Sequence, residues 1–519
     1  MKRLLFLFVV LLAAEPVSAQ KRRSSADTAV IETLLEDQDN LNTLASQHTR
    51  QIQALEERLD ELEKRLERMK GPVEEVAKLR EEIEAVRTEL AAIETSNRDL
   101  ARRAKAEDGT TDQPWFQPRF ELRIRPEYQN NRSDFDAGHA DDDLYYLQRL
   151  RVGAILKPLD TVRAVVTLQD SRMWGEEKST VSNEQNLDLH EGYAEVTDIL
   201  TPGLGFQAGR MELKYGAERQ VGPLGWSNVG RAFDGVRLFY HRPRSIQVDA
   251  FATIVRDQGR KGGANTDFFG LYARSDYWSF LDVELYGFFL YNDLRSATEK
   301  IGTVGARAVA RPVEGLTLEA EAAVQFGKSR LAGQARPGAN DHLATAYFAQ
   351  ALYRVPVRTS PVLGVFFYSA SGDANPADSR NVAYRVLFPT SHPMLGFMDL
   401  FQWTGVLDAG PTVRVAPFED LLLGLDYHLF FLTTNGGVLE NTLGGTAVFA
   451  PDRGRFLGQE LDLLVRWQAL KVLAFEFGYS FFKPGKVFEG AQVTREGSGL
   501  AALDRDLAHW FYLQGTLGF

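Results

Sequence analysis

The sequence predicts an all-β transmembrane barrel of about 18 antiparallel strands, preceded by an α-helical coiled coil. Three observations lead to this prediction. The stretch from His509 to Phe519 is rich in aromatic residues, alternates in polarity and ends in Phe, as a closing barrel strand does. Upstream, many runs of about ten residues alternate charged and apolar side chains. The connections between these runs are alternately short and long, which is the asymmetry of periplasmic turns and outer loops.

The composition suits a large barrel with an appendage. The chain has 519 residues, including 44 Gly, 33 Phe and 17 Tyr, and it has no Cys. Glycines and aromatics are abundant in the turns and girdles of barrels, and the absence of Cys avoids disulfide errors in the cell envelope. The net charge of −11 excludes nucleic acid as a partner.

Residues 1–19 are predicted to be a secretory signal peptide. Lys2 and Arg3 precede an apolar run that ends at Ala14, and small residues at Val17-Ser18-Ala19 stand at the cleavage positions. This is the pattern of a signal that is removed on export. The alternative, a single membrane anchor, needs a longer apolar run. A signal followed by barrel strands predicts the outer membrane of a Gram-negative-type bacterium.

A periplasmic coiled coil is predicted for residues 20–107, with 108–114 as a linker to a barrel at 115–519. Apolar residues recur there at alternating steps of three and four, as in a heptad seam. Gly71-Pro72 interrupts the pattern. Because a lone helix would leave this seam in water, we expect self-association; a single helix lying over the barrel or peptidoglycan is the alternative. The seam includes Ile52, Leu55, Leu59, Leu62, Leu66, Leu79, Ile83 and Val86.

Within 115–519, each predicted strand has one apolar and one polar face. In the first strand, Phe120 and Leu122 are predicted to face lipid and Arg123 the lumen. In a later strand, Leu318 is predicted to face lipid and Glu321 the lumen. The runs fall near 116–129, 144–158, 160–172, 187–198, 204–213, 232–242, 246–256, 266–276, 281–293, 300–311, 316–327, 342–354, 361–371, 405–417, 421–433, 457–469, 472–483 and 508–519.

The long connections are predicted to lie outside the cell. They are 173–186, 214–231, 372–404, 434–456 and 484–507. Of these, 214–231 and 372–404 are long enough to fold into the pore as gates. An even number of strands also places both ends of the barrel in the periplasm, where the coiled coil is predicted.

The sequence lacks the common signatures of enzymes. The sequence has no HExxH, G-x-S-x-G, G-x-G-x-x-G or paired CxxC motif. His190-Glu191 is interpreted as a hydrogen-bonded lumenal pair, and the acidic stretch around Asp141 as a solvated loop in preference to a calcium site. We therefore predict a protein that is not an enzyme and has no cofactor and no metal.

Several short strings together resemble the alginate-export family of outer-membrane barrels. The resemblance extends over roughly 115–519, and the coiled coil departs from the best-known member. The strings are Gln169-Asp170-Ser171-Arg172, Asp188-Leu189-His190-Glu191, Ala208-Gly209-Arg210, Trp226-Ser227-Asn228, Gly230-Arg231, Phe233-Asp234-Gly235-Val236-Arg237-Leu238, Ser371-Gly372-Asp373 and Leu387-Phe388-Pro389-Thr390.

The resemblance implies a barrel of eighteen strands that passes an acidic polysaccharide through an arginine-rich constriction. Alternation places six arginines on lumenal faces, and the matching strings contribute three more, with Asp234 as a carboxylate partner. The alternative is a neutralised network that only stiffens the wall. The predicted pore residues are Arg119, Arg123, Arg125, Arg149, Arg151, Arg163, Arg210, Arg231, Arg237 and Asp234. For Arg210, alternation from Leu204 through Phe206 predicts the lipid face unless a bulge intervenes.

These observations predict a channel that passively conducts an anionic, uronate-type polysaccharide or oligosaccharide. Its partners would be the polymer or small anions, outer-membrane lipid and, through the coiled coil, further copies of the chain. A general anion or phosphate-type porin oligomerised by the coiled coil is one alternative. A structural envelope tether is a second, and a barrel-embedded hydrolase is a third.

Overall fold

The computed structural model divides into two units, Met1–Pro114 and Trp115–Phe519. In the first unit the structure describes only 55, 58, 61, 62, 64 and 82–86, all of them helical. Leu62, Ile83 and Val86 are buried there and pack with Leu55. In the second unit it describes 115–519 apart from 140, 178–185, 243–244, 258–264, 295–296, 331–338, 376, 393, 443–444 and 496–498.

Several predictions for the first unit fall outside these residues. The signal peptide at 1–19 and the linker at 108–114 lie entirely outside the described part of the chain, as does most of the coiled coil at 20–107. The buried cluster is formed within one chain, and it includes four residues of the predicted seam. It does not test self-association, which stays a prediction.

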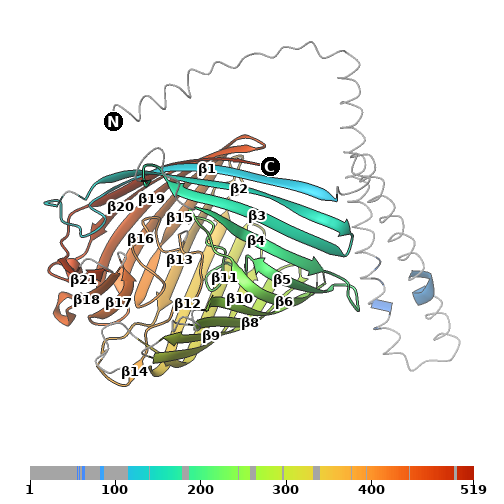
Figure 1. The fold of residues 1–519 in the computed structure, drawn as a ribbon, viewed down its shortest axis with the longest axis horizontal. Helices are drawn as coiled ribbons and strands as arrows, with labels where there is room; N and C mark the ends of the chain where they lie inside the picture. The colour runs from blue at the N-terminus through green and yellow to red at the C-terminus, as the bar shows by residue number, and fades with distance from the viewer. Residues whose placement is uncertain are drawn as a thin grey trace, which may run out of the picture. The chain divides into compact units, whose positions relative to one another are not determined.

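The second unit is a closed antiparallel barrel (Figure 1). Among the described residues its sheet has 19 strands, of which the two-residue β14 pairs only with β12, so that 18 strands form the wall. Neighbours in the wall follow chain order, and the last strand pairs with the first from Glu121↔Gly518 to Asn130↔His509. This pairing leaves no free sheet edge, as a bilayer requires. In the described residues, no helix is both long and apolar enough to span a membrane.

The 18 wall strands lie within a few residues of the predicted runs. They are β1 Phe116–Asn130, β2 Asp143–Leu159, β3 Val162–Met173, β4 Leu187–Val196, β5 Leu204–Met211, β6 Phe233–Arg242, β7 Ile246–Asp257, β8 Asn265–Trp278, β9 Leu281–Leu294, β10 Ala297–Ala310, β11 Leu316–Ser329, β12 Asn340–Arg354, β13 Val362–Ala370, β15 Val406–Phe418, β16 Leu421–Leu432, β19 Phe456–Leu470, β20 Leu473–Pro484 and β23 Ala508–Gly518.

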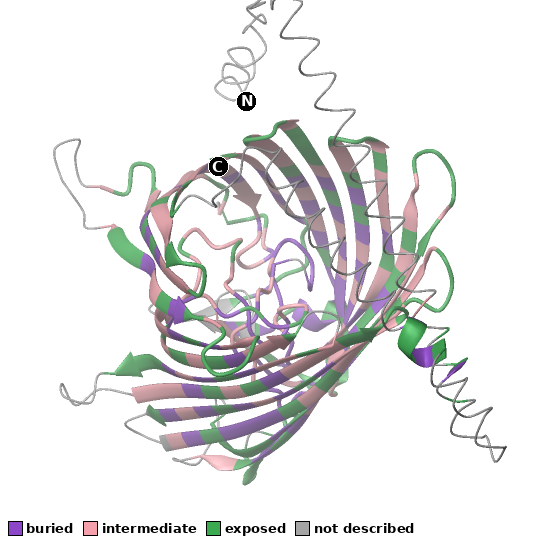
Figure 2. Cartoon of the chain, turned by 90° about the vertical axis from the view of Figure 1, so that its right-hand side faces the viewer, coloured by how far each residue is buried: buried purple, intermediate pink, exposed green. Residues whose placement is uncertain are grey.

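Alternation along the strands separates an apolar outer face from a polar inner one. On β11, Leu318, Val324 and Phe326 are exposed on the outside, whereas Glu321 and Gln325 are buried on the inside. The same banding of exposed and buried residues runs along many strands in Figure 2. The prediction of an outward apolar face is confirmed for this strand, and the inner face holds polar groups that need partners within the barrel.

Two of the long connections contain further strands that the sequence does not indicate. β17 Gly437–Thr442, β18 Gly445–Phe449, β21 Gln492–Arg495 and β22 Gly499–Ala502 form a separate four-stranded antiparallel sheet. The long connections 434–456 and 484–507 therefore contain strands of their own. The reason is that each hairpin is too short to be stable alone, and pairing between the two connections, as between β18 and β21, supplies the missing ladder.

Two other connections fold into the barrel. They are the β5–β6 loop (212–232) and the β13–β15 loop (371–405), and the second contains β14 Arg380–Asn381. Segments without regular strands cross the interior of the ring in Figure 2. Buried apolar residues of these loops join the main core together with wall residues; they include Leu213, Val221, Leu395, Met398, Leu400 and Phe401. The hydrophobic core of the barrel thus lies between loops and inner wall.

Candidate functional site

An arginine cluster lies on the inner faces of β1 and β2. Arg123 on β1 stands directly opposite Arg149 on β2. Together with Arg125 they are almost fully buried, with at most 4% of each residue exposed. Like charges directly opposite one another are destabilising in a sheet, so this arrangement needs compensating groups nearby.

Carboxylates of the same wall supply part of that compensation. Arg149 Nε donates to Glu121 Oε1 at 2.7 Å, and Arg125 Nε donates to Glu127 Oε1 at 2.6 Å. Glu127 also accepts hydrogen bonds from the Tyr145 hydroxyl and the Trp510 indole. Each of these two arginines therefore has one neutralising partner on the wall.

Arg123 differs from its neighbours because its partners are neutral. It donates from Nη1 to the carbonyl oxygen of Gly225 and from Nη2 to that of Ser227, each at 2.8 Å. Among the described residues, no carboxylate forms an ion pair with Arg123. Its charge is thus held by backbone dipoles of the β5–β6 loop.

Trp226 fixes this loop between the wall and the second loop. The Arg125 guanidinium lies over the Trp226 ring, 3.6 Å from its centroid, and Arg125 Nη1 donates to the Trp226 carbonyl at 2.7 Å. On the ring, His392 of the β13–β15 loop stacks at 3.7 Å with an interplanar angle of 5°. His392 is in turn held by Asp399 at 2.8 Å. The stack links the wall, the β5–β6 loop and the β13–β15 loop.

The β13–β15 loop is attached to β19 of the wall by backbone groups. Phe397 N donates to Asp462 Oδ2 at 3.1 Å, and Met398 N donates to Glu460 Oε1 at 2.9 Å. Gly396 has φ +81°, and a Cβ there would lie 2.6 Å from Glu460 Oε1. Only glycine fits this contact, because a side chain would meet both an unfavourable φ and the carboxylate.

Behind Asp462 the wall carries a buried imidazole–carboxylate chain. His428 Nδ1 lies 2.8 Å from Asp408 Oδ2, and its Nε2 lies 3.4 Å from Asp462 Oδ2. All three residues are buried. An imidazole between two carboxylates is positioned to hold a proton, and here it supports the carboxylate that accepts Phe397 N.

The two inward loops also pair with each other. Val221 and Phe388 form a parallel bridge, with Gly222 N donating to the Phe388 carbonyl at 2.8 Å. Arg231 Nη1 donates to the carbonyls of Gly222 and Pro389 at 3.1 and 3.0 Å. Burial lowers the pKa of Arg231 to about 10, since no anion offsets the loss of water around its guanidinium.

A second arginine of the β5–β6 loop, Arg219, reaches a third part of the wall. It donates to Glu319 at 2.6 Å and to Glu321 at 2.9 Å, and it lies 3.3 Å over the Phe348 ring. Burial alone disfavours its charge, but Tyr368 and these two carboxylates raise the pKa of Arg219 above its usual value. Unlike Arg123, it is neutralised.

Three more predicted pore arginines are ion-paired at the wall. Arg119 lies 2.9 Å from Glu191, Arg163 lies 2.9 Å from Glu195, and Arg237 lies 3.7 Å from Asp249. Further inner-wall arginines that the sequence reasoning missed follow the same rule, and alternation within their strands was the signal that would have found them. They are Arg307 with Glu284 and Glu319, Arg414 with Asp426, and Arg466 with Glu476.

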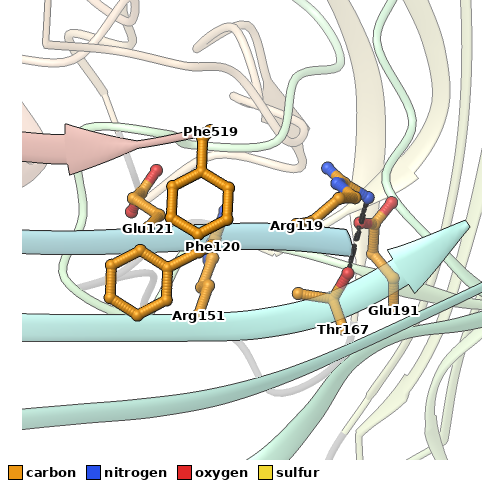
Figure 3. A pocket seen from close by; sticks show the side chains of 7 residues that line it. All are labelled: Arg119, Phe120, Glu121, Arg151, Thr167, Glu191 and Phe519. Carbon is orange, nitrogen blue, oxygen red and sulfur yellow. Dashed lines mark hydrogen bonds and ion pairs between the residues drawn. The ribbon is translucent and has the colours of Figure 1, made fainter. Parts of the chain in front are cut away.

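A cavity of about 170 Å³ adjoins the arginine cluster (Figure 3). Arg151 lines it and also contacts Gln169 at 2.7 Å and Glu212 at 3.6 Å. Figure 3 shows Arg119 turned toward Glu191 at one end of the cavity. The lining residues are Arg119, Phe120, Glu121, Arg151, Thr167, Glu191 and Phe519.

Arg210 and Asp234 do not belong to this inner surface. They are register partners on β5 and β6, 3.0 Å apart, and Asp234 shares its face with the exposed, outward Val236 and Leu238. The lumenal placement predicted for both is therefore corrected. The β5–β6 register runs without a shift from Leu204 to Met211, so Arg210 keeps the outward parity of Phe206.

Outside the arginine cluster, three aspartates have the spacing to hold a metal ion. Asp136, Asp504 and Asp506 bring one oxygen each within 4.8 Å of one another in the described part of the chain. Asp141 instead caps the nearby loop, because it accepts hydrogen bonds from Asn131 N at 2.6 Å and from Ser133 N at 2.9 Å.

The family described as Alginate export matches residues 115–498. Among solved structures, the chain is similar to three outer-membrane proteins of Pseudomonas aeruginosa. OccK8 (OprE) is 12% identical with a TM-score of 0.49, over 78% of this chain and 98% of that one. OccK11 (OpdR) is 13% identical with a TM-score of 0.48, over 78% and 96%. OpdK, solved with vanillate, is 11% identical with a TM-score of 0.48, over 78% and 99%. A search of curated proteins returned no match.

Proposed function

The chain belongs to the alginate export family of outer-membrane barrels, and from this premise we propose that it conducts an anionic, uronate-type polysaccharide. As a member of that family it is an outer-membrane channel. The substrate, its passive movement and the role of individual arginines are parts of the proposal. No energy source is assigned to the chain, so a gradient or polymer synthesis would set the direction.

One observation carries the proposal, namely the uncompensated charge of the arginine cluster. Arg149 and Arg125 each have a wall carboxylate, whereas Arg123 has only carbonyl oxygens. A buried guanidinium without an anion creates a local positive potential on the inner wall. Guanidinium groups also match the planar geometry of carboxylates, so an anionic sugar unit is the solute that this surface favours.

The paired arginines support the sliding of a polymer. Arg119, Arg163 and Arg237 retain carboxylate partners, so each offers only part of its charge to a passing solute. Conduction requires binding that is strong enough for a solute to enter and weak enough for it to leave. A wall of paired arginines beside Arg123, which has only carbonyl partners, meets that requirement for a chain with repeated carboxylates.

A general anion or phosphate-type porin is the second candidate. The observation that favours it is the position of the two inward loops, which contact each other through Val221 and Phe388 and reduce the width available to a polymer. The proposed functions differ in one measurable respect, because a narrow porin would pass small anions without being blocked by oligomers.

For the first unit we propose the organisation inferred from the sequence: a signal peptide at 1–19, a periplasmic coiled coil at 20–107 and a linker at 108–114, ahead of the barrel at 115–519. The buried contacts of Leu62 with Ile83 and Val86 support an apolar seam. Self-association through this seam and a tether to peptidoglycan remain proposals. Analytical ultracentrifugation of the full chain and of a variant lacking 20–107 would test the first of these.

The central test is single-channel conductance in planar bilayers. The reversal potential under a KCl gradient measures ion selectivity, and uronate oligomers are then added to one side. Anion selectivity with block by the oligomers is the expected result. Anion selectivity without block would favour the small-anion porin, and a cation-selective pore would contradict both.

A further inference from the structure

The guanidinium groups of Arg123 and Arg149 are occupied by one short stretch of backbone. Arg123 holds the carbonyl oxygens of Gly225 and Ser227 at 2.8 Å. Arg149 Nη1 donates to the same two oxygens at 3.1 and 3.0 Å. Two guanidinium groups thus share a pair of oxygen atoms, which is the contact that they otherwise make with the two oxygens of a carboxylate.

The shared oxygens are neutral, and this makes the contact exchangeable. A hydrogen bond from a guanidinium to a carboxylate is roughly twice as strong as one to a neutral acceptor. Arg123 has no ion-pair partner in the part of the chain that the structure describes. An arriving carboxylate would therefore bind this position more strongly than the carbonyl of Gly225 or Ser227 does.

The stretch that carries these carbonyls is closed at its base by backbone contacts. Arg231 N donates to the Pro223 carbonyl at 2.7 Å, which ties the two ends of the stretch together. Next to this hydrogen bond, the bridge between Val221 and Phe388 fixes the base of the loop. Residues 224–230, here called the tip, form a compact closed loop. Besides the contacts at Arg123 and Arg149, Trp226 lies between Arg125 and His392. Asn228 donates to the carbonyls of Gln148 and Arg172.

Glycines allow the backbone of the tip to lie close to the arginines of the wall. Gly230 has φ +78°, and a Cβ there would lie 2.7 Å from Arg151 Nη2. Gly225 and Val229 are exposed, so the tip has one side against the wall and the other open. The close approach at Gly230 lets the backbone reach the guanidinium groups, as a ligand would.

The cavity in Figure 3 lies beside this contact. It is lined by Glu121, which accepts the hydrogen bond from Arg149 Nε. Arg119 and Glu121 precede Arg123 along β1, which starts at the end of the barrel with the short turns. That end faces the periplasm in outer-membrane barrels. A polymer from the periplasm would meet Arg119 and Arg151 first and the tip next.

We propose that the tip is a built-in substitute for the transported polymer, and that polymer carboxylates release it by replacing the carbonyl oxygens of Gly225 and Ser227 at Arg123 and Arg149. The channel is then opened by its own substrate. This inference rests on the proposed function, because it takes the solute to be a chain with repeated carboxylates. It adds a mechanism in which a neutral solute of equal size leaves the tip in place.

The test measures how readily a thiol on the tip reacts with a soluble maleimide. The chain has no Cys, so Ser227→Cys introduces a single reporter in the full-length protein. Ser391→Cys is the matched control, since Ser391 is also half-buried but lies on the β13–β15 loop. Each variant is first checked for the folded barrel by its heat-modifiable mobility on gels.

Uronate oligomers are expected to accelerate labelling at position 227 roughly fivefold, with no change at position 391. Neutral oligosaccharides of equal length are expected to change neither rate. A second variant that adds Arg123→Gln and Arg149→Gln to the tip reporter should label faster without any oligomer than the tip reporter alone does, because the two carbonyls have lost their guanidinium donors.

The other outcomes contradict the inference in distinguishable ways. If uronate oligomers block the wild-type channel but leave labelling at position 227 unchanged, the tip is not displaced and the proposed function survives. Equal acceleration by neutral and uronate oligomers would show that bulk, and not charge, moves the tip. If the oligomers alter neither the conductance nor the labelling, the inference and the proposed function both fail.

Discussion

Arg123 and Arg149 face each other across β1 and β2, and both donate to the carbonyl oxygens of Gly225 and Ser227. Two cations that would repel each other are thus held together by a loop that crosses the lumen. The relationship joins the selectivity of the wall to the position of the loop. Changes at either arginine should therefore affect both properties.

Charge reversal at Arg123 is expected to reduce anion selectivity. In Arg123→Glu the wall loses its uncompensated positive charge, and the new carboxylate repels both the anionic solute and the loop carbonyls. The reversal potential under a KCl gradient should shift toward cation selectivity, and block by uronate oligomers should weaken about tenfold. Arg311→Glu is the control, because Arg311 is largely exposed and lies 3.2 Å from Asp282, away from the cluster. An equal shift in the control would mean that only overall charge matters.

Trp226→Ala is expected to increase the conductance. The indole contacts both Arg125 and His392, so its removal eliminates one of the links that hold the two inward loops to the wall. Larger and more frequent openings should appear in single-channel recordings. Trp467→Ala serves as the control, since Trp467 is exposed and its indole donates to Asp420 at 3.0 Å. Unchanged openings in Trp226→Ala would show that the stack does not limit the pore.

Gly396→Ala is expected to loosen the β13–β15 loop. The added methyl group meets the Glu460 carboxylate and an unfavourable φ, at a cost of about 1–3 kcal/mol. Limited proteolysis should cleave within 371–405 faster than in the wild type. Gly454→Ala is a close control, because Gly454 has a similar φ of +82° with no neighbour within 4 Å. If both variants are cleaved at the same rate, the contact with Glu460 is not what seats the loop.

Arg231 should contribute a pH-dependent step in alkaline solution. Burial lowers its pKa from the ordinary value of an arginine to about 10, so the folded protein binds fewer protons than the unfolded chain between pH 10 and that ordinary value. Stability from this residue is therefore reduced at neutral pH and recovers as the pH rises through that window. Its positive charge is lost over the same range, and anion selectivity should fall as the pH rises past 10.

The comparison with Arg231→Gln isolates this step from other groups that titrate at alkaline pH. Reversal potentials of both proteins are measured from pH 8 to about 11, around the ordinary range for Lys and Tyr. The difference between the two curves should shrink as Arg231 loses its proton. A constant difference across the range would contradict the lowered pKa.

Much of the wall was predictable because strand alternation is a local property. The runs at 116–129 and 316–327 match β1 and β11 closely, and the inward side of Arg123 follows from its neighbours in sequence. Strand alternation also assigns Arg210 correctly, in this case to the outer face. Its outward parity was visible from Leu204 and Phe206, and the family resemblance alone placed it in the lumen.

The partners of those side chains could not be predicted in the same way. Nothing near Arg123 in the sequence indicates that Gly225 and Ser227 will accept its hydrogen bonds, because these residues are about a hundred positions apart. The same is true of Trp226 and His392. Loops lack a periodic pattern, and their positions depend on contacts that exist only once the barrel has closed.

A barrel wall with arginines on its inner face follows from the sequence alone, since a period of two residues assigns each side chain to lipid or lumen. The tertiary structure decided which of those arginines are neutralised and which are held by loop carbonyls. The physical reason is that charge compensation acts through space between groups far apart in the chain, whereas alternation acts between neighbours. For Arg123, alternation determines the face of the strand, and contacts through space determine the partner.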